Sequence, residues 1–177
     1  MSLQQDLSLA SIGTGVIFYY YNSNDILSFL LQKRSQNVMK HKGKIGTIGG
    51  YSHNTINGTQ FESAEDALWR EIKEEAGREF RNTLSPKDFT LNNVAKIRPN
   101  IELSSNGKER INYHFIWARE ISEESAMLAH PADKYEVDAI CYLTQLELYN
   151  EIETDMTVPW FKSVLSELQS TPVIPYC

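Results

Sequence analysis

The sequence predicts one α/β domain in which helices cover a β-sheet. Three observations predict it. Apolar, β-branched and aromatic runs recur along the chain, segments with helical periodicity lie between and after them, and no repeat or low-complexity linker divides the 177 residues. With 41% hydrophobic and 23% charged residues, the chain can form one core, whereas two full domains would be cramped. We therefore expect a single domain over residues 1–177, with residues 1–12 as a flexible N-terminal segment.

Five runs are expected to be strands of that sheet. Each is rich in valine, isoleucine, tyrosine or phenylalanine, which are favoured on the pleated surface of a sheet. In chain order the runs are Gly15–Tyr21, Ile26–Leu31, Phe89–Ile97, Ile111–Ala118 and Val137–Leu143.

Two helices are expected between and after these strands. The first is Ala64–Ala76, because Ser63 is suited to an N-cap, Asp66 to its capping-box partner, and Gly77 to the position just past the end. The second runs from about Pro159 to Leu168, since proline is accepted in a first helical turn. Its aromatic residues, Trp160 and Phe161, are expected to pack in the core.

Composition and charge exclude several classes of protein. The net charge of -6 argues against a nucleic-acid polymer as the main partner, because phosphate backbones are bound by clustered lysine and arginine. Two cysteines, Cys141 and the terminal Cys177, do not make a disulfide framework or a cysteine-rich metal site. No apolar run is long enough to span a bilayer, and the first ten residues lack the order of a signal peptide. We expect a cytoplasmic protein that does not bind membranes.

A basic loop precedes a pair of glycines before the first helix. Residues 40–44 carry three lysines and a histidine, and Gly49 and Gly50 follow, where the backbone can approach a ligand closely. Two interpretations remain open for Lys44 and for Arg34 upstream: solvated surface charge, or binding of an anionic substrate near these glycines.

The helix expected over Ala64–Ala76 concentrates carboxylates beside its buried face. At about 100° per residue, its apolar residues form one stripe, and Glu71, Glu74 and Glu75 lie together at the edge of that stripe. Like charges three or four residues apart on a helix cost roughly 0.2–0.5 kcal/mol per pair. A charge-laced solvated helix is one explanation. The other is a divalent cation, and oxygen-only ligands favour Mg²⁺ over Zn²⁺.

The spacing around these glutamates resembles the Nudix box, G-x5-E-x7-R-E-U-x-E-E-x-G-U, where U is a bulky apolar residue. Seven fixed positions are met in register. They are Glu62, Arg70, Glu71, Ile72, Glu74, Glu75 and Gly77. Two positions depart from the pattern: Ile56 stands where the box has its first glycine, and Arg78 stands at the final apolar position. Upstream of the box, Ile48 replaces the proline that often precedes the two glycines. We therefore align Gly50 with the first glycine and infer a six-residue insertion within Tyr51–Phe61.

This resemblance implies a Nudix-type α/β/α sandwich with a mixed central β-sheet. It also implies hydrolysis, by water attack at phosphorus, of a phosphoanhydride bond in a nucleoside diphosphate linked to another moiety. Glu71, Glu74 and Glu75 would hold Mg²⁺, or Mn²⁺ in its place, with the Gly50 carbonyl as a further ligand. Glu62 and Arg70 would orient this cluster.

Several alternatives stay open at this point. The general base lies either inside the box or in a loop before the last strand, where Glu136 and Asp133 are the candidates. Substrate identity depends on loops outside the box, with Arg34, Lys44 and Gly49 as candidate contacts. The alternative function is a Nudix-like module that senses a nucleotide ligand without hydrolysing it. The sequence does not distinguish a monomer from a homodimer.

Overall fold

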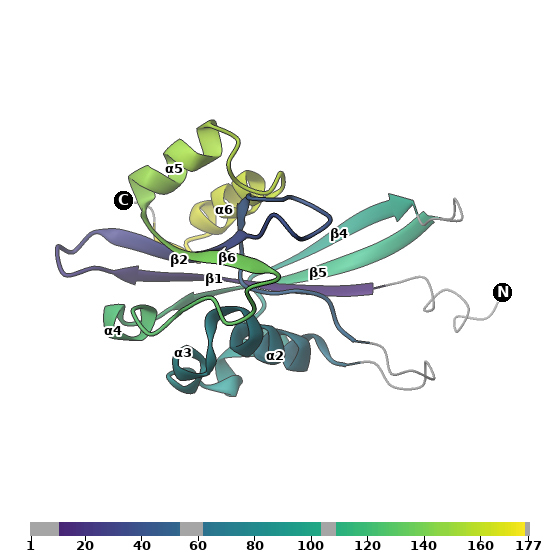
Figure 1. Cartoon of the computed structure of the whole chain (residues 1–177), viewed down its shortest axis with the longest axis horizontal. Helices are drawn as coiled ribbons and strands as arrows, with labels where there is room; N and C mark the ends of the chain where they lie inside the picture. Colours follow the sequence, from purple (N-terminus) through teal and green to yellow (C-terminus); the bar gives the residue numbers. More distant parts are fainter. Residues whose placement is uncertain (1–10, 54–61, 104–108, 176–177) are drawn as a thin grey trace.

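The computed structural model describes residues 11–53, 62–103 and 109–175. Six strands form one sheet in the order β3-β2-β1-β5-β4, and β6 pairs with β2 (Figure 1). Among the strands of the described residues, β1 and β5 pair in parallel and the other pairs are antiparallel, so the sheet is mixed. The strands are β1 (Ser11–Tyr21), β2 (Leu27–Arg34), β3 (Ile45–Gly46), β4 (Lys96–Leu103), β5 (Glu109–Glu120) and β6 (Val137–Thr144).

Helices cover both faces of this sheet, as Figure 1 shows. One face carries α2 (Ala64–Ala76), α3 (Arg78–Asn82) and α4 (Glu123–Ala126), and the other carries α5 (Gln145–Glu153) and α6 (Phe161–Ser170). Alternate side chains of β1 point to opposite faces. Val16, Phe18 and Tyr20 therefore pack with α2, whereas Ile17 and Tyr19 pack with α5 and α6. The expected α/β/α sandwich with a mixed central sheet is confirmed.

The first expected helix has the predicted bounds. Ser63 caps it by accepting a hydrogen bond from the Asp66 backbone N–H at 3.0 Å. The Asp66 carboxylate accepts from the Ser63 hydroxyl at 2.9 Å, so the two side chains bond to each other within the cap. Gly77 ends the helix with φ at 94°, and a Cβ there would lie 2.4 Å from the His130 ring. Only glycine fits that position without strain.

Several observed elements differ from those expected. The strand expected over Phe89–Ile97 is wrong, because Pro86–Phe89 and Leu91–Asn93 are 3₁₀ turns and the strand begins only at Lys96. The apolar character of this segment reflects burial of Phe89 against Phe18, at a ring separation of 6.2 Å. The last helix begins at Phe161 and ends at Ser170, and helix α5 was not expected at all.

The loop between β3 and α2 runs along the first half of β1 in place of β2. The Thr14 and Val16 backbone N–H groups donate to the Gly50 and Ile48 carbonyls at 2.7 and 2.9 Å. Gly49 has φ at 146°, and a Cβ there would lie 2.2 Å from the Thr14 carbonyl oxygen. This close contact between loop and strand brings the two glycines next to helix α2.

Two sequence expectations concern residues that are only partly described. Residues 11 and 12 of the expected flexible segment belong to β1, and residues 1–10 lie outside the described residues. Most of the insertion expected within Tyr51–Phe61 also lies outside them. In the described residues, no helix combines the length and apolar character needed to cross a membrane.

Candidate active site

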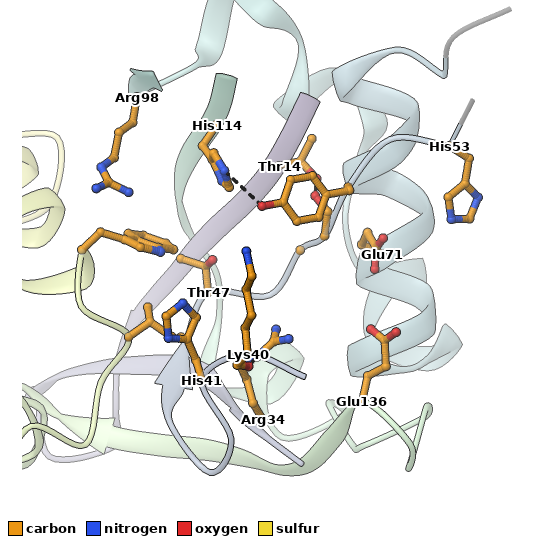
Figure 2. Close-up of a pocket in the computed structure, with 16 residues that line it drawn as sticks. Thr14, Arg34, Lys40, His41, Thr47, His53, Glu71, Arg98, His114 and Glu136 are labelled. Carbon is orange, nitrogen blue, oxygen red and sulfur yellow. Dashed lines mark hydrogen bonds between the residues drawn. The ribbon is translucent and has the colours of Figure 1, made fainter. Parts of the chain in front are cut away.

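A cavity of about 390 Å³ opens where the glycine loop, helix α2 and the segment before β6 meet (Figure 2). Gly49, Gly50 and Tyr51 line it from the loop, and Glu71 and Glu136 line it on an acidic side. Arg34, Lys40, His41, Arg98, His114 and Trp160 are also among the lining residues. The cavity therefore has carboxylates on one side and cationic and aromatic side chains on another.

Two carboxylates of the expected cluster are buried. Glu71 is 6% exposed and Glu75 is 2% exposed, whereas the Glu74 side chain is 47% exposed. Burial raises the pKa of Glu71, and hydrogen bonding to Arg70 opposes that rise. Burial also raises the pKa of Glu75 well above its usual value, and the neighbouring Glu71 charge raises it further. The helix thus holds partly desolvated acids that favour either a proton or a cation.

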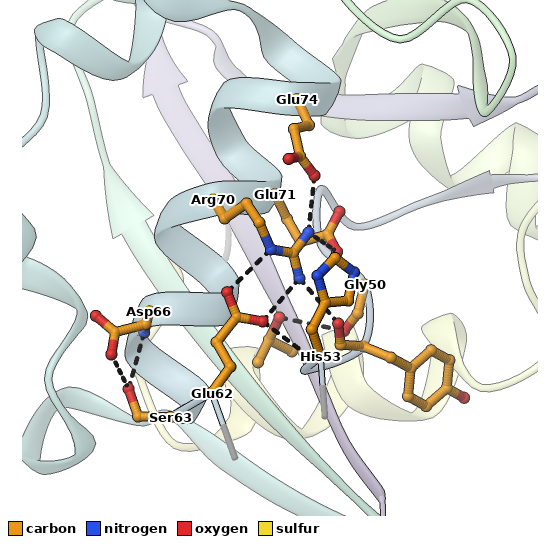
Figure 3. A network of polar contacts seen from close by, with 10 residues as sticks. Gly50, His53, Glu62, Ser63, Asp66, Arg70, Glu71 and Glu74 are labelled. Atoms are coloured by element: carbon orange, nitrogen blue, oxygen red, sulfur yellow. Dashed lines mark hydrogen bonds and ion pairs between the residues drawn. The ribbon is translucent and has the colours of Figure 1, made fainter. Parts of the chain in front are cut away.

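Arg70 connects these carboxylates to the rest of the site (Figure 3). Its Nη1 donates to Glu71 Oε1 and to Glu74 Oε2, each at 2.7 Å. Its Nε and Nη2 donate to the two oxygens of Glu62 at 2.9 and 3.0 Å, and Nη2 also donates to the Tyr51 carbonyl at 3.0 Å. The paired guanidinium lowers the pKa of Glu62, and the carboxylates raise the pKa of Arg70. The sequence-predicted pair of Glu62 and Arg70 therefore lies in one network with Glu71 and Glu74.

Glu75 lies behind this network, against the glycine loop. Its Oε2 accepts from the Gly49 backbone N–H at 2.6 Å and from Gln32 Nε2 at 2.8 Å. Gln32 also donates to the Thr47 carbonyl at 2.8 Å, which ties β2 to the loop. Its own Oε1 is buried and has no partner within the described residues. The two donors hold the Glu75 carboxylate against the loop.

Gly50 packs directly on Glu71. A Cβ at Gly50 would lie 2.4 Å from Glu71 Oε1, so only a glycine leaves room for the carboxylate there. The Gly50 carbonyl accepts from the Thr14 N–H at 2.7 Å and from the Thr14 hydroxyl at 3.2 Å. The alignment of Gly50 with the box glycine thus agrees with its position beside Glu71.

The donor chemistry of this cluster fits a hard divalent cation. Across residues 11–53, 62–103 and 109–175, no three acidic, histidine or cysteine side chains are grouped as metal ligands, and Arg70 lies between Glu71 and Glu74 instead. The cluster nevertheless offers only oxygen donors, and two of its carboxylates are buried with raised pKa values. Oxygen donors of this kind suit Mg²⁺ or Mn²⁺ once the carboxylates release Arg70.

The remaining predicted residues divide between the cavity and its surroundings. Glu136 lines the cavity near Glu71, whose pKa it raises, whereas Asp133 accepts from the Tyr135 N–H in a turn. Arg34 also lines the cavity, and its Nε donates to the Lys40 carbonyl at 3.2 Å. Lys44 is not among the lining residues, since its Nζ pairs with Asp155 at 3.0 Å. Lys40 is the lysine of this loop that lines the cavity.

Sequence reasoning missed part of the cavity wall. Trp160 was expected in the core, but it is half-buried and lines the cavity, whereas its neighbour Phe161 is fully buried. Arg98 and His114 are paired across β4 and β5. The Tyr51 hydroxyl lies 3.4 Å from His114 Nε2. No spacing in the sequence joins these residues, because they come together only through strand register.

Solved structures of other proteins share this architecture, although no sequence match identifies a family. No family model matches the sequence, and no curated protein matches it either. Among solved structures, the Nudix domain of Shewanella oneidensis NrtR, complexed with ADP ribose, has a TM-score of 0.63 at 12% identity and covers 97% of this chain and 99% of its own.

Two further solved structures are similar to this chain over most of its length. The MutT protein from Methanosarcina mazei has a TM-score of 0.58 at 16% identity, with 92% of this chain and 95% of that chain covered. A C. elegans Ap4A hydrolase has a TM-score of 0.53 at 15% identity, with 92% and 98% covered. Structural similarity over nearly the whole length, together with the mixed sheet between two helical layers, shows that this chain has the Nudix fold.

Proposed function

We propose that the protein is a Nudix hydrolase that cleaves a phosphoanhydride bond in a nucleoside diphosphate linked to another moiety, with Mg²⁺ or Mn²⁺ as its cofactor. One observation carries the proposal: Glu71 and Glu75 are buried side by side beside a cavity whose opposite side is cationic. Burying two neighbouring acids is unfavourable unless a positive charge compensates them. A divalent cation would neutralise the carboxylates on one side of the cavity, and the polyanion bound to it would neutralise the cationic side chains on the other.

Glu71, Glu74 and Glu75 are the residues that would hold the cation, and the Gly50 carbonyl would add an uncharged oxygen. When bound, the cation supplies positive charge that polarises phosphoryl oxygens and activates water for attack at phosphorus. Glu74 is exposed and forms an ion pair with Arg70. Its carboxylate can therefore turn toward the cavity without opening a void in the core. Gln32 and the Gly49 N–H hold Glu75 from behind, which fixes one carboxylate in advance.

Arg70 and Glu62 act as positioning residues in this proposal. Two hydrogen bonds to Glu62 and one to the Tyr51 carbonyl keep the guanidinium in place after it releases Glu71 and Glu74. The same bonds connect helix α2 to the loop that carries Gly50. The spacing between the helix carboxylates and the Gly50 carbonyl therefore depends on this pair.

Glu136 is the group that would take the proton from the attacking water. It extends into the cavity from the segment before β6, on the side where Glu71 lies (Figure 2). Arg34 and Lys40 line the same cavity and would bind phosphoryl oxygens on the side away from the helix. The water then attacks phosphorus, the anhydride oxygen leaves with the second phosphate, and no covalent enzyme intermediate forms.

One observation favours the alternative, a nucleotide-sensing module that does not hydrolyse its ligand. Arg70 neutralises Glu71 and Glu74 in this structure, so the site carries its own cation. The two functions differ in products. Incubation with Mg²⁺ and a panel of nucleotide sugars, dinucleoside polyphosphates and ADP-ribose yields monophosphate products only if the protein is a hydrolase.

Metal dependence and the glutamates provide the decisive test. Turnover should vanish after chelation and return with Mg²⁺ or Mn²⁺, and Glu74→Gln and Glu75→Gln should each lower kcat by at least about 100-fold. Glu79→Gln is the matched control, because Glu79 is an exposed acid on the next helix, near His130. Full turnover in chelator, or parent rates in both glutamine variants, would refute the proposal.

A further inference from the structure

Arg98 is a half-buried cation that the proposed hydrolysis does not use. It lies on β4 and lines the cavity, with its guanidinium carbon 5.8 Å from the centre of the Trp160 ring. Within the described part of the chain, its guanidinium contacts this indole and has neither a carboxylate partner nor a hydrogen bond to another residue. A guanidinium that is partly desolvated without an acid partner is suited to an anionic ligand.

The sheet and the helical layer fix this side chain from two directions. Arg98 pairs with His114 on β5, and His114 pairs with Gly13 on β1, so the three positions form one row across the sheet. A Cβ at Gly13 would lie 2.6 Å from the His114 ring, so the glycine leaves space for that ring. Trp160 approaches from the start of α6 on the same face. A guanidinium that lies over an indole ring can present its N–H edge to a bidentate anion.

The spacing of the pair indicates an anion site and not a slot for a base. An aromatic ring between Arg98 and Trp160 would need two contacts of about 3.5 Å each, or roughly 7 Å in all. The observed 5.8 Å is shorter, so an aromatic ring does not fit between the two side chains as they lie in this structure. The ligand of Arg98 therefore meets the edge of the guanidinium, where phosphate oxygens bind.

Arg98 is separated from the carboxylates across the cavity. Figure 2 shows Arg98 on one side, Glu71 and Glu136 on the other, and Lys40 between them. A phosphate held at the glutamates through a cation is thus distinct from an anion held at Arg98. The cavity can accommodate both groups of one elongated ligand.

We propose that Arg98, held on Trp160, binds a further phosphate of the substrate, beyond the anhydride that is cleaved. This inference rests on the proposed function and narrows its substrate class to nucleotide derivatives with at least one additional phosphate. The additional group is either part of a longer polyphosphate chain or a phosphomonoester elsewhere on the molecule. Both present negatively charged, tetrahedral phosphate oxygens to the guanidinium.

Two matched pairs of substrates separate these sources. Diadenosine diphosphate and diadenosine tetraphosphate differ in chain length, and NAD and NADP differ by one phosphomonoester. Arg98→Gln should raise KM for the phosphate-rich member of at least one pair by about 10-fold or more, with kcat within about twofold. The KM of the phosphate-poor member should not change.

Arg81→Gln is the control variant. Arg81 lies over Trp69 at 5.2 Å, so it forms the same kind of cation–π pair, and it does not line the cavity. Its loss should leave KM unchanged for all four substrates. Equal changes in both members of each pair with Arg98→Gln, or no change at all, would overturn the inference.

A binding measurement keeps this test separate from the proposed function. Calorimetric titration with inorganic tripolyphosphate in chelator should give a Kd that Arg98→Gln weakens by about 10-fold and Arg81→Gln leaves unchanged. If the parent hydrolyses nothing but binding depends on Arg98, the proposed hydrolysis fails and the phosphate site stands. If the parent hydrolyses its substrates and tripolyphosphate binds both variants equally, the phosphate site fails alone.

Discussion

The unfavourable free energy of burying acids at this site is clearest at Glu75. It is 2% exposed, it lies one helical turn from Glu71, and its carboxylate is held by Gln32 and the Gly49 N–H. Without metal, burial and the Glu71 charge raise its pKa well above the usual value. The folded protein therefore retains a proton that the unfolded chain releases as the pH rises.

That proton makes the stability of the metal-free protein depend on pH. The stabilisation from a raised pKa is complete below the unfolded value of about 4.3 and is lost as the pH rises through the folded value. In chelator near pH 8, Glu75→Gln should be at least as stable as the parent, because the variant loses the repulsion with Glu71, which costs roughly 0.2–0.5 kcal/mol. This difference in stability between variant and parent should shrink near pH 5.

Excess Mg²⁺ should reverse this order, because a ligand that binds only the folded state stabilises it according to its affinity. The measurement is a set of thermal melts at both pH values, with chelator and with Mg²⁺. Equal Mg²⁺-induced shifts in parent and variant would reject Glu75 as a ligand. Clear destabilisation of the variant in chelator would favour a purely structural role for this carboxylate.

Glu136 and Asp133 form a second test at the residue scale, since the sequence could not separate them. Glu136 lines the cavity and Asp133 caps a turn through the Tyr135 N–H. Glu136→Gln should lower kcat by about 100-fold or more. Asp133→Asn should leave kcat unchanged. An unchanged kcat in Glu136→Gln would move the base into helix α2.

At the scale of elements, local signals and long-range packing determine which predictions succeeded. Helix α2 was predicted to the residue, because Ser63 and Gly77 mark its ends and its apolar stripe has a helical period. The segment around Phe89 was misassigned, since Phe89 is buried from a 3₁₀ turn that packs on the core under α2 and not from a strand. Helix α5 was missed although Thr144 and Glu147 form a full capping box, because the helix follows strand β6 directly.

At the same scale, Gly77 is a position where the backbone conformation requires glycine. Its φ of 94° is disfavoured for other residues, and a Cβ would lie 2.4 Å from the His130 ring. Gly77→Ala should therefore destabilise the protein by about 1–3 kcal/mol in urea unfolding. Gly46→Ala is the control, because a Cβ there meets Val158 at an ordinary 3.4 Å without a positive φ. Equal stability of the two variants would contradict the stated role of Gly77.

At the scale of the whole molecule, the cavity is built from both sides of the sheet. The acidic wall comes from α2, and Trp160 comes from the opposite helical layer. The acidic half was predictable because the Nudix box is local in sequence. On the opposite side, the sequence indicated Arg34 and the basic loop but neither Arg98 nor Trp160, because these two residues meet only after β1, β5 and β4 adopt their register and α6 packs on them.

Because both helical layers pack on the same sheet, we expect them to unfold together. Leu30 and Leu31 are adjacent on β2, both fully buried, but Leu30 belongs to the core under α2 and Leu31 to the core under α5 and α6. Because one strand carries both cores, Leu30→Ala and Leu31→Ala should each cost about 2–5 kcal/mol and lower the urea midpoint with the same m-value.

Two optical probes check this expectation from both sides of the sheet. Trp117 lies in the core under α2, and Trp160 packs against the other core, so tryptophan fluorescence and far-UV circular dichroism should give coincident transitions in the parent and in both variants. A two-step curve, or a variant that shifts only one probe, would mean that the helical layers are separate folding units. Coincident curves would mean that any ligand stabilising α2 also stabilises Trp160 on the opposite layer, since the two layers then share one folding equilibrium.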